Sequence, residues 1–379
     1  MKKKRYWRNL INSFTFNLII VLTIFFPVYL EAQEQTQKWI SITVSNGAHT
    51  VGIRTDGTLW AWRNNVRGQL GDGTTISRHA YRQVGTDTNW ASVAAGGVLF
   101  IDGYLAGGHT IAIKTDGTLW AWGRNLEGQL GDGTTTDRHS PVRIGFQTNW
   151  ASVSAGAAHT VAIRTDGTLW AWGLNDSGQL GNGTTNSSSI PIQIGTEANW
   201  AFVAAGMFYT VALKKDGTLW AWGNNSYGQL GDGTTTNHII PVRIGTSSNW
   251  LSVSASYVHT VAVRTDGTLW AWGNNNYGQL GDGTTTNRIS PVRIGTSSNW
   301  LNVSAGGWHT MAIRKDGTLW AWGCNEDGQL GDGTNINRTN PVQIASEYSD
   351  FATVSVGDIS SVGTSTDGEI WYIGDLRAW

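Results

Sequence analysis

The sequence predicts an all-β protein made of seven similar units, and two observations support this prediction. First, the phrase DGTLWAW occurs six times in the 379-residue chain, and a weaker copy, DGEIWYI, follows them. The copies begin at Asp56, Asp116, Asp166, Asp216, Asp266, Asp316 and Asp367. Second, each copy stands among short stretches of alternating apolar and polar residues, a pattern typical of β-strands. A fixed period of about 50 residues indicates one supersecondary unit repeated along the chain.

One unit, residues 250–299, shows how each element is predicted. WLSVSA alternates apolar and small polar residues, and HTVAVRT is rich in β-branched residues. TLWAWG places Trp270 and Trp272 on one face of a strand, and PVRIG begins with a proline that suits a strand start. Thr-Asp-Gly-Thr between the second and third stretches is a strong hairpin signal. The repeated unit therefore predicts a seven-bladed β-propeller of four-stranded antiparallel blades.

The repeats make residues 33–379 a single domain. Its units span about 39–89, 90–149, 150–199, 200–249, 250–299, 300–350 and 351–379. The first stretch of the unit occurs seven times but the fourth only six times, because the seventh unit lacks it. By register, the missing stretch would fall near residues 30–34. We expect one blade to be a strand short, or to use residues 33–38 in its place.

Residues 1–32 differ from the rest of the chain. Five basic residues precede an uncharged, mostly apolar run over 14–30, and Ala32 supplies a small residue for cleavage. This pattern favours a secretory signal peptide removed after Ala32, with an uncleaved membrane anchor as the alternative. We therefore expect an exported protein (extracellular, periplasmic or on the cell surface) that meets a membrane only through an uncleaved signal segment.

Charge and cysteine content narrow the classes of partner. Without residues 1–32 the formal net charge moves from −1 to about −5, and no basic run remains, which argues against nucleic-acid binding. Cys324 is the one cysteine of the chain, so it cannot form an intramolecular disulfide or a thiolate metal cluster.

A longer string within the sixth unit resembles a known repeat. Residues 306–344 read GGWHTMAIRKDGTLWAWGCNEDGQLGDGTNINRTNPVQI. This string is similar to the repeat of the regulator of chromosome condensation family, which is marked by Gly-x-x-His, Asp-Gly, Trp-Gly, Asn-x-x-Gly-Gln-Leu-Gly and a later Pro-x-x-Ile/Val. Arg63 departs from the pattern by replacing the glycine of Trp-Gly. The resemblance implies a seven-bladed propeller, and we favour a secreted bacterial type. It does not fix an activity, because members include nuclear exchange factors for a small GTPase and secreted bacterial proteins such as a β-lactamase inhibitor.

Two repeat positions carry side chains that we predict to be structural. A histidine begins the second stretch in five units, where Tyr209 and Ser360 stand in the other two, and a tryptophan recurs in the third stretch. These residues are His49, His109, His159, His259, His309, Trp62, Trp122, Trp172, Trp222, Trp272 and Trp322. Equivalent positions on a seven-fold ring are too far apart to converge on a metal. We expect the histidines to make structural hydrogen bonds, and we expect no metal and no other cofactor.

The remaining motifs give no catalytic residue. A basic residue precedes six of the Asp-Gly hairpins, and we interpret it as a solvated hairpin end. These residues are Arg54, Lys114, Arg164, Lys214, Arg264 and Arg314. Neither HExxH nor GxSxG occurs. The sequence therefore predicts that the protein is not an enzyme.

The units differ most in two loops. In a four-stranded meander the first and third loops leave from the same end of the blade, so their variable residues should share one face. The candidate binding residues there are Phe100, Tyr104, Phe208, Tyr209, Tyr227, Tyr257, Tyr277 and Trp308. An apolar insertion over residues 97–107 lies in the same region. It is either a contact element or a segment folded over the short-stranded end of the ring.

These observations favour an exported, non-catalytic binding or protein-interaction module that uses one loop face of the propeller. Its partner would be a protein or a glycan, and we expect the chain to be monomeric. Two alternatives remain. One is a guanine-nucleotide exchange factor-like regulator of a small GTPase, and the other is an enzyme with a site at the centre of the ring.

Overall fold

The computed structural model describes residues 38–46, 49–101, 104–358 and 360–374. These residues form seven antiparallel sheets, of which six have four strands and the last has three. The predicted seven-bladed propeller with one short blade is thereby confirmed. Residues 33–37 lie outside the described residues, so their expected use as a replacement strand stays a prediction.

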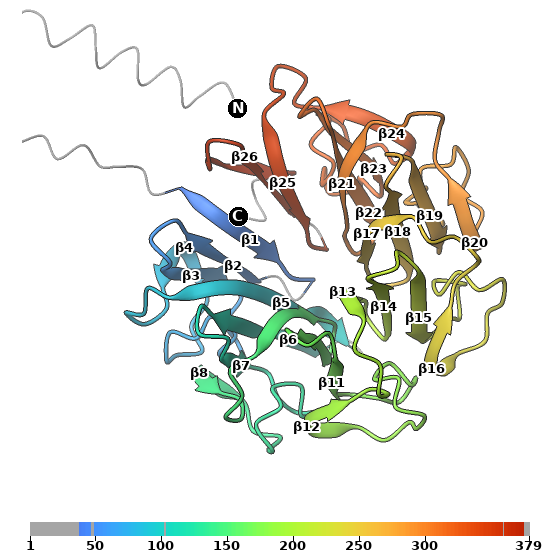
Figure 1. Ribbon diagram of the computed structural model, residues 1–379. Helices are drawn as coiled ribbons and strands as arrows, with labels where there is room; N and C mark the ends of the chain where they lie inside the picture. Colours follow the sequence, from blue (N-terminus) through green and yellow to red (C-terminus); the bar gives the residue numbers. More distant parts are fainter. Residues whose placement is uncertain (1–37, 47–48, 102–103, 359, 375–379) are drawn as a thin grey trace, which may run out of the picture. The chain divides into compact units, whose positions relative to one another are not determined.

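Each blade is a meander whose strands follow chain order (Figure 1). The first strands are β1 (Trp39–Val44), β5 (Trp90–Ile101), β9 (Trp150–Ala155), β13 (Trp200–Ala205), β17 (Trp250–Ala255), β21 (Trp300–Ala305) and β25 (Phe351–Val356). The second strands are β2 (His49–Arg54), β6 (Tyr104–Lys114), β10 (His159–Arg164), β14 (Tyr209–Lys214), β18 (His259–Arg264), β22 (His309–Arg314) and β26 (Ser361–Ser365). The third strands are β3 (Leu59–Arg63), β7 (Leu119–Gly123), β11 (Leu169–Gly173), β15 (Leu219–Gly223), β19 (Leu269–Gly273), β23 (Leu319–Gly323) and β27 (Ile370–Ile373). The fourth strands are β4 (Arg78–Gln83), β8 (Arg138–Arg143), β12 (Ser188–Gln193), β16 (His238–Arg243), β20 (Arg288–Arg293) and β24 (Arg338–Ile344).

The first strands surround the centre of the propeller. Each first strand contacts the first strand of the next blade, and β25 of blade 7 contacts β1 of blade 1. Backbone contacts also close this junction, where Trp39 N donates to Gly368 O at 3.1 Å. The ring is therefore complete within the described residues, and the small side chains of the first strands face its centre.

The Asp-Gly hairpin forms the turn between the second and third strands of each blade. In blade 5, Asp266 Oδ1 accepts hydrogen bonds from Thr268 N at 2.9 Å and from the Thr268 hydroxyl at 2.6 Å. Gly267 has a φ of 77°, a left-handed conformation that glycine adopts without steric cost. Its carbonyl accepts a hydrogen bond from Trp300 N, the first residue of the next unit. The repeated hairpin thus also fixes where the following blade begins.

The apolar core lies between neighbouring blades. Between blades 4 and 5, Val211 and Leu219 of one blade pack against Trp250 and Trp272 of the next. Trp250 meets Trp272 edge to face at a centroid distance of 5.9 Å. The six predicted structural tryptophans are all buried. The other tryptophan of each third strand, such as Trp270, is half-buried.

A single backbone carbonyl joins most neighbouring blades. In blade 4, Gln229 O of the Gly-Gln-Leu-Gly motif accepts hydrogen bonds from Trp272 Nε1 at 2.9 Å and from the Thr260 hydroxyl at 2.8 Å, both in blade 5. The same glutamine position accepts from the next blade's threonine at Gln69, Gln129, Gln179 and Gln279. The tryptophan bond also recurs, except that Trp172 Nε1 has no recorded partner among the described residues.

The repeated histidines make a second contact between blades. His259 Nε2 lies 3.0 Å from the Thr310 hydroxyl of the next blade, and all five imidazoles are fully buried. Tyr209, which replaces histidine in blade 4, reaches the equivalent Thr260 hydroxyl at 3.0 Å. Burial lowers the pKa of each of the five histidines to about 3, so all five are neutral in the folded protein near pH 7.

At the junction between blades 7 and 1, neither the glutamine-carbonyl contact nor the histidine–hydroxyl contact is recorded among the described residues. The Thr50 hydroxyl and Trp62 Nε1 are buried without a partner among the described residues. Ser360 stands where other blades have histidine, and Arg63 Nη1 donates to its hydroxyl at 2.7 Å. Arg63 occupies the position of a repeated glycine and has a φ of 82°. The two departures from the repeat therefore form one substitute contact at the point where the ring closes.

The basic residues before the hairpins are not solvated, which corrects the interpretation made from the sequence. Arg164 Cζ lies 3.7 Å from the ring centroid of Trp170 and 4.6 Å from that of Trp150. Lys214 lies over the equivalent rings and also pairs with Glu197 at 2.6 Å. A cation held against aromatic faces contributes about 0.5–2 kcal/mol. These residues are part of the packing of each blade.

The buried histidines predict a loss of stability in acid. Because the folded pKa of about 3 lies below the unfolded value of about 6.5, only the unfolded chain takes up these protons as the pH falls. The free energy of unfolding should decrease from about pH 6.5 toward pH 3, by up to about 1.4 kcal/mol per pH unit for each histidine. Urea titrations at several pH values measure this slope.

The matched control is His159→Tyr, since Tyr209 already makes the equivalent contact in blade 4. Both positions follow a glycine three residues earlier, Gly156 or Gly206, and face a threonine of the next blade. The pH slope of the unfolding free energy measures how many protons the chain takes up on unfolding, and in the variant this number should be smaller by about one. A slope identical to that of the wild type would contradict the histidine assignment.

The blade 7–blade 1 junction should open before the other junctions. Hydrogen exchange measured by mass spectrometry should show faster exchange in β25, β27 and β1 than in the equivalent strands of blades 4 and 5, because the junction has fewer hydrogen bonds. Ser360→Ala should raise exchange there and leave blade 4 unchanged. Uniform protection around the ring would show that the junction is not the weak point.

Candidate interaction face

The first and third loops of each blade lie at the same end of the ring, as the sequence predicted. Asn224 N of the third loop in blade 4 donates to Phe208 O of the first loop at 2.9 Å. Cys324 N and Trp308 O form the equivalent bond in blade 6 at 2.9 Å. We call this end the loop face and the opposite end, with the Asp-Gly turns, the hairpin face. The backbone of the variable loops is therefore held by regular hydrogen bonds.

Hydrogen bonds between neighbouring first loops form a collar on the loop face. Gly97 N donates to Gly156 O at 2.9 Å, and Met207 N donates to Ser256 O at 2.9 Å. Gly307 N donates to the Gly357 carbonyl at 3.2 Å. The collar, recorded at the junctions of blades 2–3, 3–4, 4–5 and 6–7, borders one end of the central cavity and holds the backbone of the loops that carry the variable side chains.

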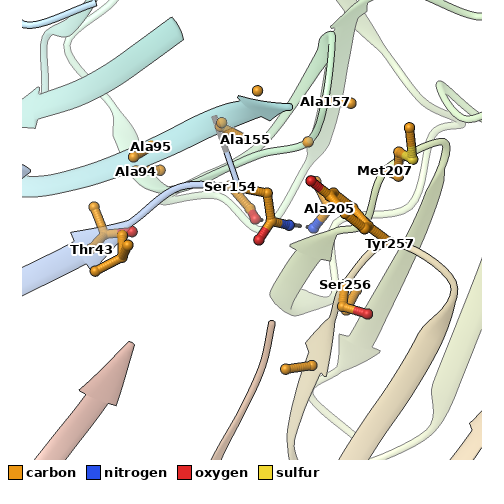
Figure 2. A pocket seen from close by; sticks show the side chains of 18 of the residues that line it. Thr43, Ala94, Ala95, Ser154, Ala155, Ala157, Ala205, Met207, Ser256 and Tyr257 are labelled. Carbon is orange, nitrogen blue, oxygen red and sulfur yellow. Dashed lines mark hydrogen bonds between the residues drawn. The ribbon is translucent and has the colours of Figure 1, made fainter. Parts of the chain in front are cut away.

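The central cavity has a volume of about 160 Å³ and is lined by all seven first strands. Figure 2 shows its small side chains, with Met207 and Tyr257 as the larger ones and the Ser154 hydroxyl accepting a hydrogen bond from Ala205 N at 3.0 Å. No carboxylate, imidazole or thiol belongs to the described lining. The described part of the chain also contains no cluster of three or more His, Cys, Asp or Glu that could hold a metal.

The insertion over residues 97–107 extends the hairpin of β5 and β6. The two strands stay paired as far as Ile101 and Tyr104. Val98 is buried and packs with Ala157, Met207 and Tyr257 of blades 3 to 5. The base of the insertion therefore covers the collar of those blades, and this packing does not support the alternative in which it covers the short-stranded blade. The side chains of Phe100 and Tyr104 lie outside the described residues.

Five of the predicted binding residues have side chains at the loop face. Tyr227 is 41% exposed, whereas Phe208, Tyr257, Tyr277 and Trp308 are half-buried. The structure brings three of them together. Trp308 meets Tyr257 at a centroid distance of 5.9 Å and Tyr277 at 5.6 Å, both edge to face.

Tyr209 is a correction to the predicted binding face. Its side chain is fully buried, and its hydroxyl donates to His259 O at 2.6 Å. The sequence grouped it with the variable aromatic residues because it follows Phe208, but it occupies the structural histidine position of its blade. Tyr209 is therefore unavailable to a partner.

Asp358 is a loop-face residue that sequence reasoning missed. It lies in the first loop of blade 7 and accepts a hydrogen bond from the Tyr257 hydroxyl. Burial, together with the Asp327 carboxylate, raises the pKa of Asp358 to about 6. Burial and the Asp358 charge also raise the pKa of Tyr257. The signal was present in the sequence, because Asp358 holds the same loop position as Gly307, one of the variable residues.

Charge is distributed unevenly over the loop face. In blades 1 and 2, Arg67 pairs with Asp137 at 3.6 Å and Arg124 with Glu127 at 3.7 Å. In blades 6 and 7, the loop residues Glu326, Asp327 and Asp358 are acidic, and within the described residues no recorded salt bridge joins any of them to a basic side chain. The aromatic group around Trp308 therefore lies in an acidic part of the face.

Within the described part of the chain, no helix is long and apolar enough to cross a bilayer. The expected signal segment over residues 1–32 lies outside the described residues.

Known proteins resemble this chain in both sequence and fold. A stretch of 104 residues is 36% identical to the protein RCC2 of Mus musculus and covers 27% of this chain, but only 18% of RCC2. Human WBSCR16 superposes with a TM-score of 0.76 at 22% identity, covering 88% of each chain. Prp20p of Saccharomyces cerevisiae superposes with a TM-score of 0.74 at 21% identity, covering 90% of this chain and 84% of Prp20p. At these identities the two structures establish the fold alone.

The family comparison covers more of the chain than any of these relatives does by sequence. The model of the RCC1-like domain matches residues 23–362 of the 379-residue chain. This range includes the described blades almost entirely, together with the inter-blade glutamine and histidine positions. The chain therefore belongs to the RCC1-like domain family.

Proposed function

We propose that this RCC1-like propeller is a non-catalytic interaction module that works outside the cytoplasm and binds a macromolecular partner through its loop face. The collar is the observation that carries the proposal, because a hydrogen-bonded backbone there presents side chains that differ from blade to blade. Aromatic residues such as Trp308 and Tyr227 lose little conformational entropy on binding when the backbone is already ordered. Each can therefore contribute a large share of the affinity.

Regulation of a small GTPase is the second candidate. Prp20p of yeast, which shares the fold, is described as binding Gsp1p and histones. The apolar, signal-like segment over residues 1–32 favours export over a partner of this kind. A catalytic site at the centre of the ring has less support, because the described cavity lining offers hydroxyl groups and one phenol but no acid–base pair.

Replacement of loop-face aromatic residues should abolish binding of the partner. The double variant Tyr227→Ala with Trp308→Ala removes one exposed and one half-buried ring, and we expect affinity to fall at least about 100-fold. The immobilised protein is incubated with envelope and medium fractions of the producing organism, and bound proteins and glycans are quantified by mass spectrometry. The melting temperature of each variant reports whether the ring stays folded.

Phe146→Ala is the matched control for this experiment. Phe146 is an aromatic residue that is 92% exposed in the loop after β8, at the hairpin face. Its loss should leave capture unchanged. Capture that survives the double variant, or that depends on Phe146, would place the binding surface elsewhere.

Export predicts a shortened N-terminus. Intact-mass measurement of the native protein should give a chain that begins near Gln33, because cleavage is expected after Ala32. The family match begins at residue 23, inside the expected signal segment, which makes this measurement informative. A full-length chain in the membrane fraction would support the anchor instead, and a full-length chain in the cytoplasm would contradict export.

A further inference from the structure

We propose that Tyr257, Tyr277 and Trp308, together with the Asp358 carboxyl group, form a site for an arginine or lysine side chain of a polypeptide partner. This inference rests on the proposed function and specifies the chemistry of the partner. The four residues come from the loops of three consecutive blades. Tyr257 and Tyr277 belong to blade 5, Trp308 to blade 6 and Asp358 to blade 7.

The hairpin face provides an internal example of the same chemistry. Trp250 and Trp270 meet edge to face at 6.0 Å and 77°, and Arg264 Cζ lies 4.4 Å and 3.8 Å from their centroids. On the loop face, Tyr257 and Trp308 meet at 5.9 Å and 75°. The two aromatic pairs thus have nearly the same geometry, and the Trp pair is one that binds a guanidinium group.

Among the described residues, no Lys or Arg side chain is recorded over the ring of Tyr257 or Trp308. At the hairpin face, by contrast, cations such as Lys114 and Arg264 lie over tryptophans of the first and third strands. The side chains of Tyr257 and Trp308 are half-buried, so each keeps part of its surface open to solvent. The negative face of an aromatic ring attracts a cation most strongly where water is partly excluded.

The carboxyl group beside the pair supplies the opposite charge. Asp358 accepts a hydrogen bond from Tyr257, and a side chain at Gly307 would collide with the Asp358 carboxylate. Glycine at 307 therefore keeps the carboxyl group next to the aromatic rings. With a pKa of about 6, Asp358 is mostly ionised at pH 7.5 although it is half-buried. A bound cation would offset the cost of burying this charge.

A basic side chain fits this site better than a neutral sugar. Asp327 and Asp358 interact electrostatically, and the exposed Glu326 lies in the same third loop as Asp327. These carboxylates produce a negative potential that favours a cation and gives no comparable gain to an uncharged ligand. Arginine also stacks on aromatic faces and hydrogen-bonds carboxylates, so it can use both parts of the site.

The test uses a short peptide with one arginine. Binding of N-acetyl-Gly-Arg-Gly-amide is titrated by saturation-transfer NMR at pH 7.5, and the citrulline peptide, which has the same shape without the charge, is titrated in parallel. We expect the citrulline peptide to bind at least about 10-fold more weakly. Asp358→Asn and Trp308→Leu should each weaken binding of the arginine peptide by about 5- to 30-fold.

Phe146→Ala is the control variant. Phe146 is an exposed aromatic residue at the hairpin face, away from the four residues of the site. Its replacement should change binding of the arginine peptide less than about 2-fold. If Trp308→Leu fails to fold, Tyr277→Leu tests the same rings from the adjoining loop.

Equal binding of the arginine and citrulline peptides would overturn the inference, and so would arginine binding that Asp358→Asn and the ring variants leave unchanged. Preferential binding of a glycan at the same residues would replace it with a different ligand class. Failure of the peptide test while the loop-face double variant still loses its partner would reject the cation site and leave the proposed function intact.

Discussion

The propeller depends on one backbone carbonyl group in each of blades 1 to 5. The backbone oxygen of the glutamine in Gly-Gln-Leu-Gly accepts hydrogen bonds from the next blade's threonine and, at most junctions, from its tryptophan, as Gln229 does from Thr260 and Trp272. Because these groups are fully buried, an unpaired carbonyl there would cost free energy comparable to a lost hydrogen bond. This requirement explains why the motif hardly varies. The orientation of each blade follows from the blade before it.

A frame held in this way leaves the first and third loops free to vary. The backbone bonds of the collar involve amide and carbonyl groups, so they do not specify which side chains the loops carry. Blade 6 places Trp308 where blade 5 has Val258 without any change in the strands below. Sequence differences between the blades therefore concentrate in the loops, where they affect the stability of the fold least. Residues that contact a partner can change there while the propeller stays folded.

The period of the repeat predicted the fold, because a unit of about 50 residues with four strand-like stretches has few other solutions. The candidate site was only partly predictable. Tyr209 looked like a variable loop residue, and only its hydrogen bond to Thr260 identifies it as a substitute for histidine. Asp358 was overlooked because its side chain interacts with Tyr257, a residue 101 positions earlier in the chain. The contact between Arg63 and Ser360 joins blades 1 and 7. The repeat pattern showed that both residues differ from the consensus of the other units, but it did not show that their side chains meet.

The two ends of the ring use the same chemistry in different ways. At the hairpin face of blades 2 to 6, each aromatic pair is matched by a cation of its own blade, such as Arg264 over Trp270, so the attraction contributes to the stability of the fold. At the loop face, Tyr257 and Trp308 have similar geometry, but the neighbouring charge is the carboxylate of Asp358. A half-buried carboxylate beside aromatic rings destabilises the free protein relative to a state in which a cation pairs with it. Packing at the hairpin face stabilises the whole ring. The fold can therefore tolerate a locally unfavourable arrangement at the loop face, such as a carboxylate without a paired cation, and a binding site for a cation requires such an arrangement.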